Sequence, residues 1–276
     1  MQFHLNGFRT GDPEVTGRPT STAPHTSGTS HEEVDVLIIG SGPTGLTLAA
    51  QLAAFPEIKT RIVEEKSGAL LLGQADGIAC RTMEMFEAFG FSGRVLKEAY
   101  WVNETTFWKP DDEQRERIVR SRTIQDVEDG LSEFPHVILN QARVHDFFLD
   151  VMRNRGLEPD YSRRLMGLNI STDASSESGE PSPGKNASLY PVVAKFEQLD
   201  PARRGQLETI RARFVVGCDG ARSVVRKSLG LALHGDSANK AWGVMDVLAV
   251  TDFPDIRRKA AIHSASEGSV LIIPRE

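Results

Sequence analysis

The residues best suited to chemistry begin with a glycine-rich run at positions 40–45, Gly-Ser-Gly-Pro-Thr-Gly, which matches the pattern G-x-G-x-x-G. In such a run Gly40 permits a sharp turn, Gly42 lets the backbone approach a pyrophosphate, and Gly45 allows the next helix to pack closely on a strand. Pro43 belongs to the same turn. The N-terminus of the helix would present backbone N–H groups and the positive end of its dipole to the phosphates.

An acidic residue follows at the distance that nucleotide binding requires. Glu64 lies nineteen positions after Gly45 (64 minus 45), at the end of a second apolar segment. A carboxylate there can accept hydrogen bonds from an adenosine ribose. The alternative is a glycine-rich turn with an incidental acid, but the turn has the strand, helix and acid that a dinucleotide site needs.

The elements that must position these residues are read from apolar periodicity. The turn is preceded by a predicted strand and followed by a helix and a second strand, which together make a βαβ unit with a parallel sheet. Three further helices are predicted, and they end at Gly90, Gly156 and Gly230. The predicted strands are 34–39, 60–64, 210–214, 243–250 and 269–273, and the predicted helices are 46–53, 78–89, 144–152 and 224–229.

Four further runs carry polar residues at fixed positions. They are Gly-Gln-Ala-Asp-Gly at 73–77, Leu-Asn-Gln-Ala-Arg at 139–143, Val-Val-Gly-Cys-Asp-Gly-Ala-Arg-Ser at 215–223 and Pro-Arg-Glu at 274–276. With the glycine turn, they resemble the flavoprotein monooxygenases of the p-hydroxybenzoate hydroxylase fold. The 73–77 run is similar to that of the phenol 2-monooxygenases, and the resemblance continues through 242–246, 253–257 and 261–265. It implies an α/β fold, with a Rossmann-like FAD-binding domain and part of a mixed β-sheet substrate domain.

The resemblance implies two catalytic residues. Asp76 would lie at the substrate hydroxyl and accept the phenolic proton, since a phenolate attacks an electrophilic oxygen better than a phenol does. The alternative is that Asp76 caps the following helix. Arg275 would stabilise the phenolate with its fixed charge; its alternative is a solvated residue at a strand end.

The resemblance also implies cofactor contacts beyond the glycine turn and Glu64. Gln74 and Gly77 belong to the run beside the flavin ring, Gln141 lies against the flavin, and Asp219 lies near the pyrophosphate and influences NADPH engagement. Arg81 either neutralises a cofactor phosphate or covers a helix face with its aliphatic stem. The alternative for Asp219 is a plain turn, and for Gln141 an exposed polar residue near a helix start.

The implied activity is hydroxylation of a phenolic substrate, ortho to its hydroxyl, with FAD, NADPH and dioxygen and through a flavin hydroperoxide. Family members continue for several hundred residues more and would form a homodimer at full length. Two alternatives follow: a truncated FAD-binding fragment without catalysis, or a flavin oxidoreductase acting on a nonphenolic substrate. A smaller departure is Glu65, where relatives usually carry a basic residue.

Composition and cysteine spacing narrow the possible partners, ligands and location of the protein. Lysine and arginine number 32 against 38 aspartate and glutamate, a net charge of −6, which disfavours nucleic acid as a partner. Cys80 and Cys218 lack metal or disulfide spacing, so we expect reduced, buried thiols and no metal. His263 is expected in a core or behind the site residues rather than as a ligand, and Trp242 is expected in packing. The sequence contains neither an apolar run of membrane-spanning length nor a leader pattern, which favours a cytoplasmic protein without membrane contact.

The domain organisation follows from the same patterns. We expect residues 1–32 to be a disordered tail, because they are polar and lack apolar periodicity. Residues 33–235 would form the FAD-binding domain, with 98–134 contributing to the substrate side and 171–188 forming a polar surface insertion. Residues 236–276 would form a truncated substrate-domain sheet.

Overall fold

The computed structural model describes residues 32–73, 75–170, 189–236 and 238–275. The predicted disordered tail, apart from Glu32, the predicted insertion 171–188 and Gln74 therefore lie outside the described residues. Within the described ranges the chain divides into two compact units. We call residues 32–71 and 145–235 the glycine-turn unit, and residues 72–144 and 236–275 the Asp76 unit.

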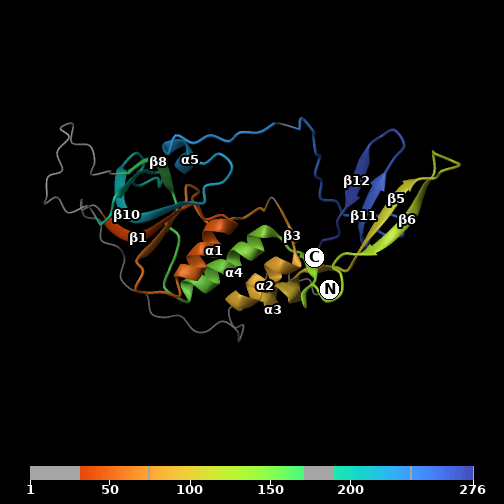
Figure 1. Ribbon diagram of the computed structural model, residues 1–276, viewed down its shortest axis with the longest axis horizontal. Helices are drawn as coiled ribbons and strands as arrows, with labels where there is room; N and C mark the ends of the chain where they lie inside the picture. Colours follow the sequence, from red (N-terminus) through yellow and green to blue (C-terminus); the bar gives the residue numbers. More distant parts are fainter. Residues whose placement is uncertain (1–31, 74, 171–188, 237, 276) are drawn as a thin grey trace. The chain divides into compact units, whose positions relative to one another are not determined.

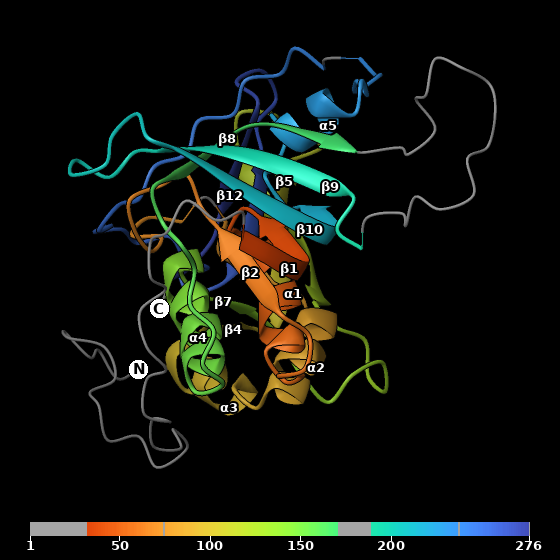
Figure 2. The ribbon, with the colours of Figure 1, turned by 90° about the vertical axis from the view of Figure 1, so that its left-hand side faces the viewer.

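The glycine-turn unit is built on a five-stranded sheet (Figures 1 and 2). Its strand order is β2-β1-β10-β9-β8, in which β1 is parallel to both β2 and β10, while β9 is antiparallel to its neighbours. The strands are β1 (Glu32–Ile39), β2 (Thr60–Val63), β8 (Arg163–Ile170), β9 (Val192–Gln198) and β10 (Leu207–Gly217), and the helices are α1 (Pro43–Leu52) and α5 (Val224–Ser228). The predicted βαβ unit is confirmed as β1-α1-β2.

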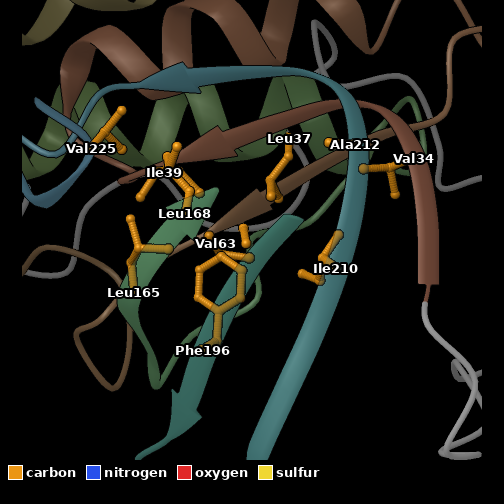
Figure 3. Packing of buried hydrophobic residues seen from close by; sticks show 11 residues of the cluster. Val34, Leu37, Ile39, Val63, Leu165, Leu168, Phe196, Ile210, Ala212 and Val225 are labelled. Atoms are coloured by element: carbon orange, nitrogen blue, oxygen red, sulfur yellow. The ribbon is translucent and has the colours of Figure 1, made fainter. Parts of the chain in front are cut away.

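Apolar side chains fill one face of this sheet (Figure 3). Leu37 and Ile39 of β1 meet Phe196 of β9, Ile210 of β10 and Val225 of α5 in one buried cluster. Ile38, between them in sequence, is also fully buried, so β1 has apolar neighbours on both faces. That explains why residues 36–39 of this strand are an unbroken apolar run rather than an alternating one.

The Asp76 unit contains two smaller sheets. The four-stranded sheet has the order β12-β11-β5-β6 and is mixed, because β11 is parallel to β5 and the other pairs are antiparallel. The three-stranded sheet has the order β3-β7-β4. The elements are β3 (Gly77–Ile78), α2 (Cys80–Phe89), α3 (Ser92–Glu98), β4 (Tyr100–Val102), β5 (Glu104–Pro110), β6 (Ile118–Gln125), β7 (His136–Ile138), β11 (Lys259–His263) and β12 (Ser269–Ile272). Helix α4 (Gln141–Arg153) begins in this unit and continues into the other.

Several predicted bounds differ from the structure. Helix α2 starts at Cys80 rather than at 78, because Gly77 and Ile78 pair with β7; it ends as predicted at Gly90, whose φ is +81°. The predicted alternation of β10 ends at Ala212, the last residue paired with β9, and the Phe214 side chain beyond it is 60% exposed.

Residues 243–250, predicted as a strand, contain no helix or strand. Their apolar side chains are exposed, Val244 to 92% and Leu248 to 104%, because none of the described strands pairs with this segment. The predicted strand at 269–273 is confirmed as β12. Among the described residues, no helix combines the length and apolar character needed to cross a membrane.

Candidate functional site

The glycine turn connects β1 to α1 and is held at both sides by backbone hydrogen bonds. The Gly40 N–H donates to the Val63 carbonyl at 2.8 Å, and the Cys218 N–H donates to the Ile39 carbonyl at 2.7 Å. Gly40 has φ +98°, and a Cβ placed on it would lie 2.5 Å from the Cys218 carbonyl oxygen. A Cβ on Gly45 would lie 1.9 Å from the Gly40 carbonyl oxygen. Only glycine fits at these two positions.

Gly42 differs from its two neighbours in the motif. Apart from chain neighbours, no heavy atom among the described residues lies within 4 Å of a Cβ placed there. Gly42 is also the N-cap of α1, and Pro43 is the first helical residue. The turn therefore leaves an open space in front of a helix N-terminus, as the pyrophosphate of a dinucleotide requires.

Glu64 is fixed against this turn. Its Oε2 accepts hydrogen bonds from the Ser41 backbone N–H at 2.8 Å and from the Ser41 hydroxyl at 3.0 Å. Its Oε1 accepts one from the Lys66 N–H at 3.0 Å. A carboxylate has about four lone-pair sites, so Glu64 retains capacity for a ribose hydroxyl. The adjacent Glu65 pairs with Arg164 at 2.8 Å.

The structure brings the Asp219 motif to the same turn. The Cα of Asp219 lies 3.1 Å from the position of a Cβ on Gly40. The Asp219 carboxylate accepts hydrogen bonds from the Ser223 hydroxyl at 2.6 Å and from the backbone N–H groups of Val224 at 2.6 Å and Val225 at 3.1 Å. Asp219 thus orders the start of α5, whatever its part in cofactor binding.

In the Asp76 unit, the run 73–77 lies along the segment that leads into α4. A Cβ on Gly73 would lie 2.5 Å from the Cβ of Gln141, and the Leu139 N–H donates to the Asp76 carbonyl at 2.9 Å. Gly77 pairs with Ile138 in the β3–β7 ladder. The structure therefore brings Asp76 and Gly77 of one predicted motif close to the segment that carries Gln141, which belongs to another.

Arg275 joins this group through its guanidinium. Nη2 lies 2.9 Å from Asp76 Oδ2, and Nη1 lies 2.9 Å from Asp246 Oδ1. The Asp76 and Arg275 side chains are 24% and 34% exposed. The helix-cap alternative for Asp76 is wrong, because the N-cap of α2 is Ala79. Arg275 does follow a strand, β12, but as an ion-paired residue rather than a solvated one.

The other residues singled out from the sequence are exposed or only partly buried. Arg81 is 88% exposed and pairs with Glu84 on α2, and its cofactor contact remains a prediction. His263 is exposed, with Nδ1 2.7 Å from the Ser269 hydroxyl, so it does not lie in a core. Trp242 is 82% exposed, so its expected packing is wrong. The two cysteines, expected to be buried, are free thiols of intermediate exposure.

Sequence reasoning missed a polar network centred on Asp126. Its carboxylate lies 2.6 Å from His136 Nδ1, and accepts hydrogen bonds from the Thr105 hydroxyl at 2.9 Å and from Lys259 Nζ at 3.2 Å. Burial acts to raise the pKa of Asp126, but hydrogen bonds from His136, Thr105 and Lys259 outweigh it, and the pKa is lowered. His136 Nε2 would lie 3.5 Å from a Cβ on Gly77, next to Asp76. The four members are far apart in sequence and form no local motif.

A buried histidine and a partly buried tyrosine near Glu64 were also missed. His145 is 5% exposed, and neither its ring nitrogens nor the Tyr161 hydroxyl have a hydrogen-bond partner among the described residues. Burial lowers the pKa of His145, and the charges of Asp146 and Glu64 oppose this shift only in part. A histidine in such surroundings stays neutral at pH 7.

Comparison with known proteins identifies the class. The profile of the family described as "FAD binding domain" matches residues 33–276, so the chain belongs to that family. Over 278 residues the chain is 60% identical to the 3-hydroxybenzoate 4-monooxygenase of Comamonas testosteroni, covering 100% of this chain and 41% of the relative. It is 32% identical over 245 residues to a phenol 2-monooxygenase of Aspergillus fumigatus, covering 89% of this chain and 37% of that protein. The chain thus spans about two fifths of the length of these relatives.

Solved structures show the same fold. The p-nitrophenol 4-monooxygenase of Pseudomonas putida is similar with a TM-score of 0.59 at 20% identity, over 74% of this chain and 46% of that one. The flavin-dependent monooxygenase PieE, solved with FAD and substrate, gives a TM-score of 0.58 at 21% identity, over 74% and 33%. The predicted Rossmann-like α/β fold, the family resemblance and FAD as the cofactor are confirmed.

Proposed function

We propose that this chain carries the FAD site and part of the substrate site of a monooxygenase that hydroxylates a phenolic compound, with NADPH as reductant and dioxygen as co-substrate. The observation that carries the proposal is the Asp76–Arg275 ion pair, next to Gly77 and near the Gly73–Gln141 contact, in a chain of the FAD binding domain family. A carboxylate and a guanidinium at one place are the groups that a phenol needs to become a bound phenolate.

The roles of the residues follow from their chemistry. Bound FAD would supply the activation of dioxygen. Glu64 would hold the ribose, and Gly42 and the N-terminus of α1 would hold the pyrophosphate. The Asp76 carboxylate would accept the phenolic proton, and the Arg275 guanidinium would stabilise the resulting oxyanion.

The substrate class is supported by the relative that is 60% identical. Carbon 4 of 3-hydroxybenzoate is adjacent to the hydroxyl-bearing carbon 3 and opposite the carboxylate-bearing carbon. An ortho hydroxylation, the prediction from the sequence, would have the same relation to the phenolic hydroxyl. We therefore propose a hydroxybenzoate as the substrate of this protein.

A carboxylate on the substrate needs a cation or a strong donor in the site. His136 and Lys259 meet at Asp126, and His136 lies beside Gly77. If they receive the substrate carboxylate, Lys259→Met raises KM for 3-hydroxybenzoate about tenfold or more and leaves KM for phenol within about twofold. An equal change for the two substrates would contradict this assignment.

The test of the proposed function is made in the protein that carries this chain. Asp76→Asn and Arg275→Met should retain FAD and lower the hydroxylation rate by about a hundredfold or more, as expected for loss of a proton acceptor and a charge. Arg258→Met is the matched control, since Arg258 is a half-exposed cation of the same unit, paired with Glu104 at 3.2 Å. Rates within about twofold of the unsubstituted protein in both site variants would overturn the proposal.

The FAD part of the proposal has a test of its own. The visible flavin spectrum of the purified 276-residue chain should show bound flavin, since Gly42 and Glu64 lie within these residues. A chain that takes up no flavin would contradict the FAD site proposed around these two residues. Product analysis with labelled dioxygen tests the remaining alternative, an oxidoreductase of nonphenolic substrates, which would incorporate no label.

A further inference from the structure

Arg275 is shared by two carboxylates that come from different parts of the Asp76 unit. One terminal nitrogen lies 2.9 Å from Asp76 and the other lies 2.9 Å from Asp246. Asp76 belongs to the run before β3, whereas Asp246 belongs to the segment 243–250, which has no helix or strand. These three groups carry one positive and two negative charges.

We propose that Asp246 is a positioning residue that competes with the substrate for Arg275. This inference rests on the proposed function, in which Arg275 stabilises a phenolate. A phenolate that reaches the guanidinium adds a further negative charge to a group whose formal sum is already −1. Displacing the Asp246 carboxylate removes one negative charge from the guanidinium and lets the oxyanion take the place of that carboxylate.

The two carboxylates are not equivalent, and their exposure indicates which one yields. The Asp76 side chain is 24% exposed, and its backbone is tied to Leu139. The Asp246 side chain is 75% exposed and sits on a segment without regular structure. An exposed ion pair contributes little free energy and weakens with salt, so the Asp246 contact is the one that opens at low cost.

The residue-specific test is the reaction of Arg275 with phenylglyoxal, followed by peptide mass spectrometry. Asp246→Asn should raise the labelling rate of Arg275 about two- to fivefold, the range expected for loss of an exposed ion pair. Asp252→Asn is the matched control, because it removes the same charge from an exposed position six residues later. Asp246→Glu should restore the slow rate. Equal labelling of Arg275 in all four proteins would overturn the inference.

The ligand test uses 3-hydroxybenzoate and the FAD-loaded protein that carries this chain. Asp246→Asn should lower the Kd about two- to fivefold, and Asp252→Asn should leave it unchanged. An unchanged or higher Kd in Asp246→Asn would overturn the competition. Failure of the unsubstituted protein to bind any phenol would contradict the proposed function instead, and the labelling rates would then decide whether Asp246 positions Arg275. Melting temperatures of the variants should agree, because Asp246 is mostly exposed.

Discussion

At the glycine turn, two glycines are required by the fold and a third is required only by a ligand. Gly40 and Gly45 are required by the protein itself, since a Cβ at either would overlap a backbone carbonyl. Gly42 meets nothing within 4 Å among the described residues, and its φ of −67° suits any residue. The fold alone therefore gives no reason for glycine at position 42, whereas a bound pyrophosphate does.

Gly42→Ala tests this distinction. The variant should fold with unchanged stability, or with a gain of up to about 1 kcal/mol from the less flexible unfolded chain. Its affinity for FAD should fall about tenfold or more, because the new methyl group occupies space that the pyrophosphate needs. Gly68→Ala is the matched control, since a Cβ there also meets nothing within 4 Å among the described residues. Equal FAD affinity in the two variants, measured by flavin fluorescence, would place the phosphates elsewhere.

His145 makes the stability of the folded protein depend on pH. Burial lowers its pKa in the folded protein, so between that pKa and about 6.5 the unfolded chain binds a proton that the folded chain does not. The free energy of unfolding therefore keeps its full value above about pH 6.5. As the pH falls from about 6.5 to the pKa of His145 in the folded protein, this free energy decreases by at most about 1.4 kcal/mol per pH unit. His145→Leu should remove this dependence without loss of stability at pH 7, because the ring nitrogens have no partner among the described residues.

The measurement is urea unfolding at several pH values between about 5.5 and 7.5. His234→Gln is the control, because His234 is exposed in the same unit. The acid slope should persist in the control and be reduced in His145→Leu. An identical slope in both variants would mean that another group titrates in this range.

At the scale of elements, the strand–turn–helix motif could be predicted because its signals are local. Apolar runs, glycines and the acid at position 64 lie within one stretch of sequence, and β1, α1 and β2 follow them closely. Segment 243–250 carries an equally apolar pattern, but strand formation also needs a partner, and none of the described strands supplies one. The predicted start of α2 was wrong because a strand partner is present there: Gly77 and Ile78 pair with β7, which lies far away in the sequence.

The packing of the run 73–77 against α4 is a property of two elements, and Gly73→Ala tests it. The Cβ would lie 2.5 Å from the Gln141 Cβ, so the run must move away, at a cost of about 1–3 kcal/mol. Hydrogen exchange at the Leu139 amide, which donates to the Asp76 carbonyl, should become faster. Gly77→Ala is the control, because its Cβ would make only an ordinary contact of 3.5 Å. Unchanged exchange at Leu139 in Gly73→Ala would show that the two segments are not coupled.

At the scale of the whole molecule, the predicted residues fall into two groups, one in each unit. Gly40, Glu64 and Asp219 meet in the glycine-turn unit, and Asp76 and Arg275 meet in the Asp76 unit. Family resemblance could predict these groups, because each motif is short and specific. The Asp126 network could not be predicted, since it joins side chains from segments that carry no motif. The Asp246 contact could not be predicted either, because the runs 242–246 and 274–276 match the family separately and no local pattern indicates that they meet.

The Asp76 unit also exposes many apolar side chains. Those of Trp242, Val244, Met245, Leu248 and Val250 are 80–104% exposed, and β12 adds Val270 at 60%. Clusters of this kind on a protein in water favour association. We therefore expect the 276-residue chain to self-associate and to bind an apolar dye such as anilinonaphthalene sulfonate.

Leu248→Lys tests whether this segment causes the association. The side chain is fully exposed, so the substitution costs little stability while it places a charge in the apolar stretch. Sedimentation velocity should show a smaller associated fraction, and dye fluorescence should fall. Gln114→Lys is the matched control, because it adds the same charge at an exposed polar position of the same unit and so separates the loss of apolar surface from the change in net charge. If both variants associate as the unsubstituted chain does, the contact lies on another surface, and the exposed strand β12 is the next to test by Val270→Lys.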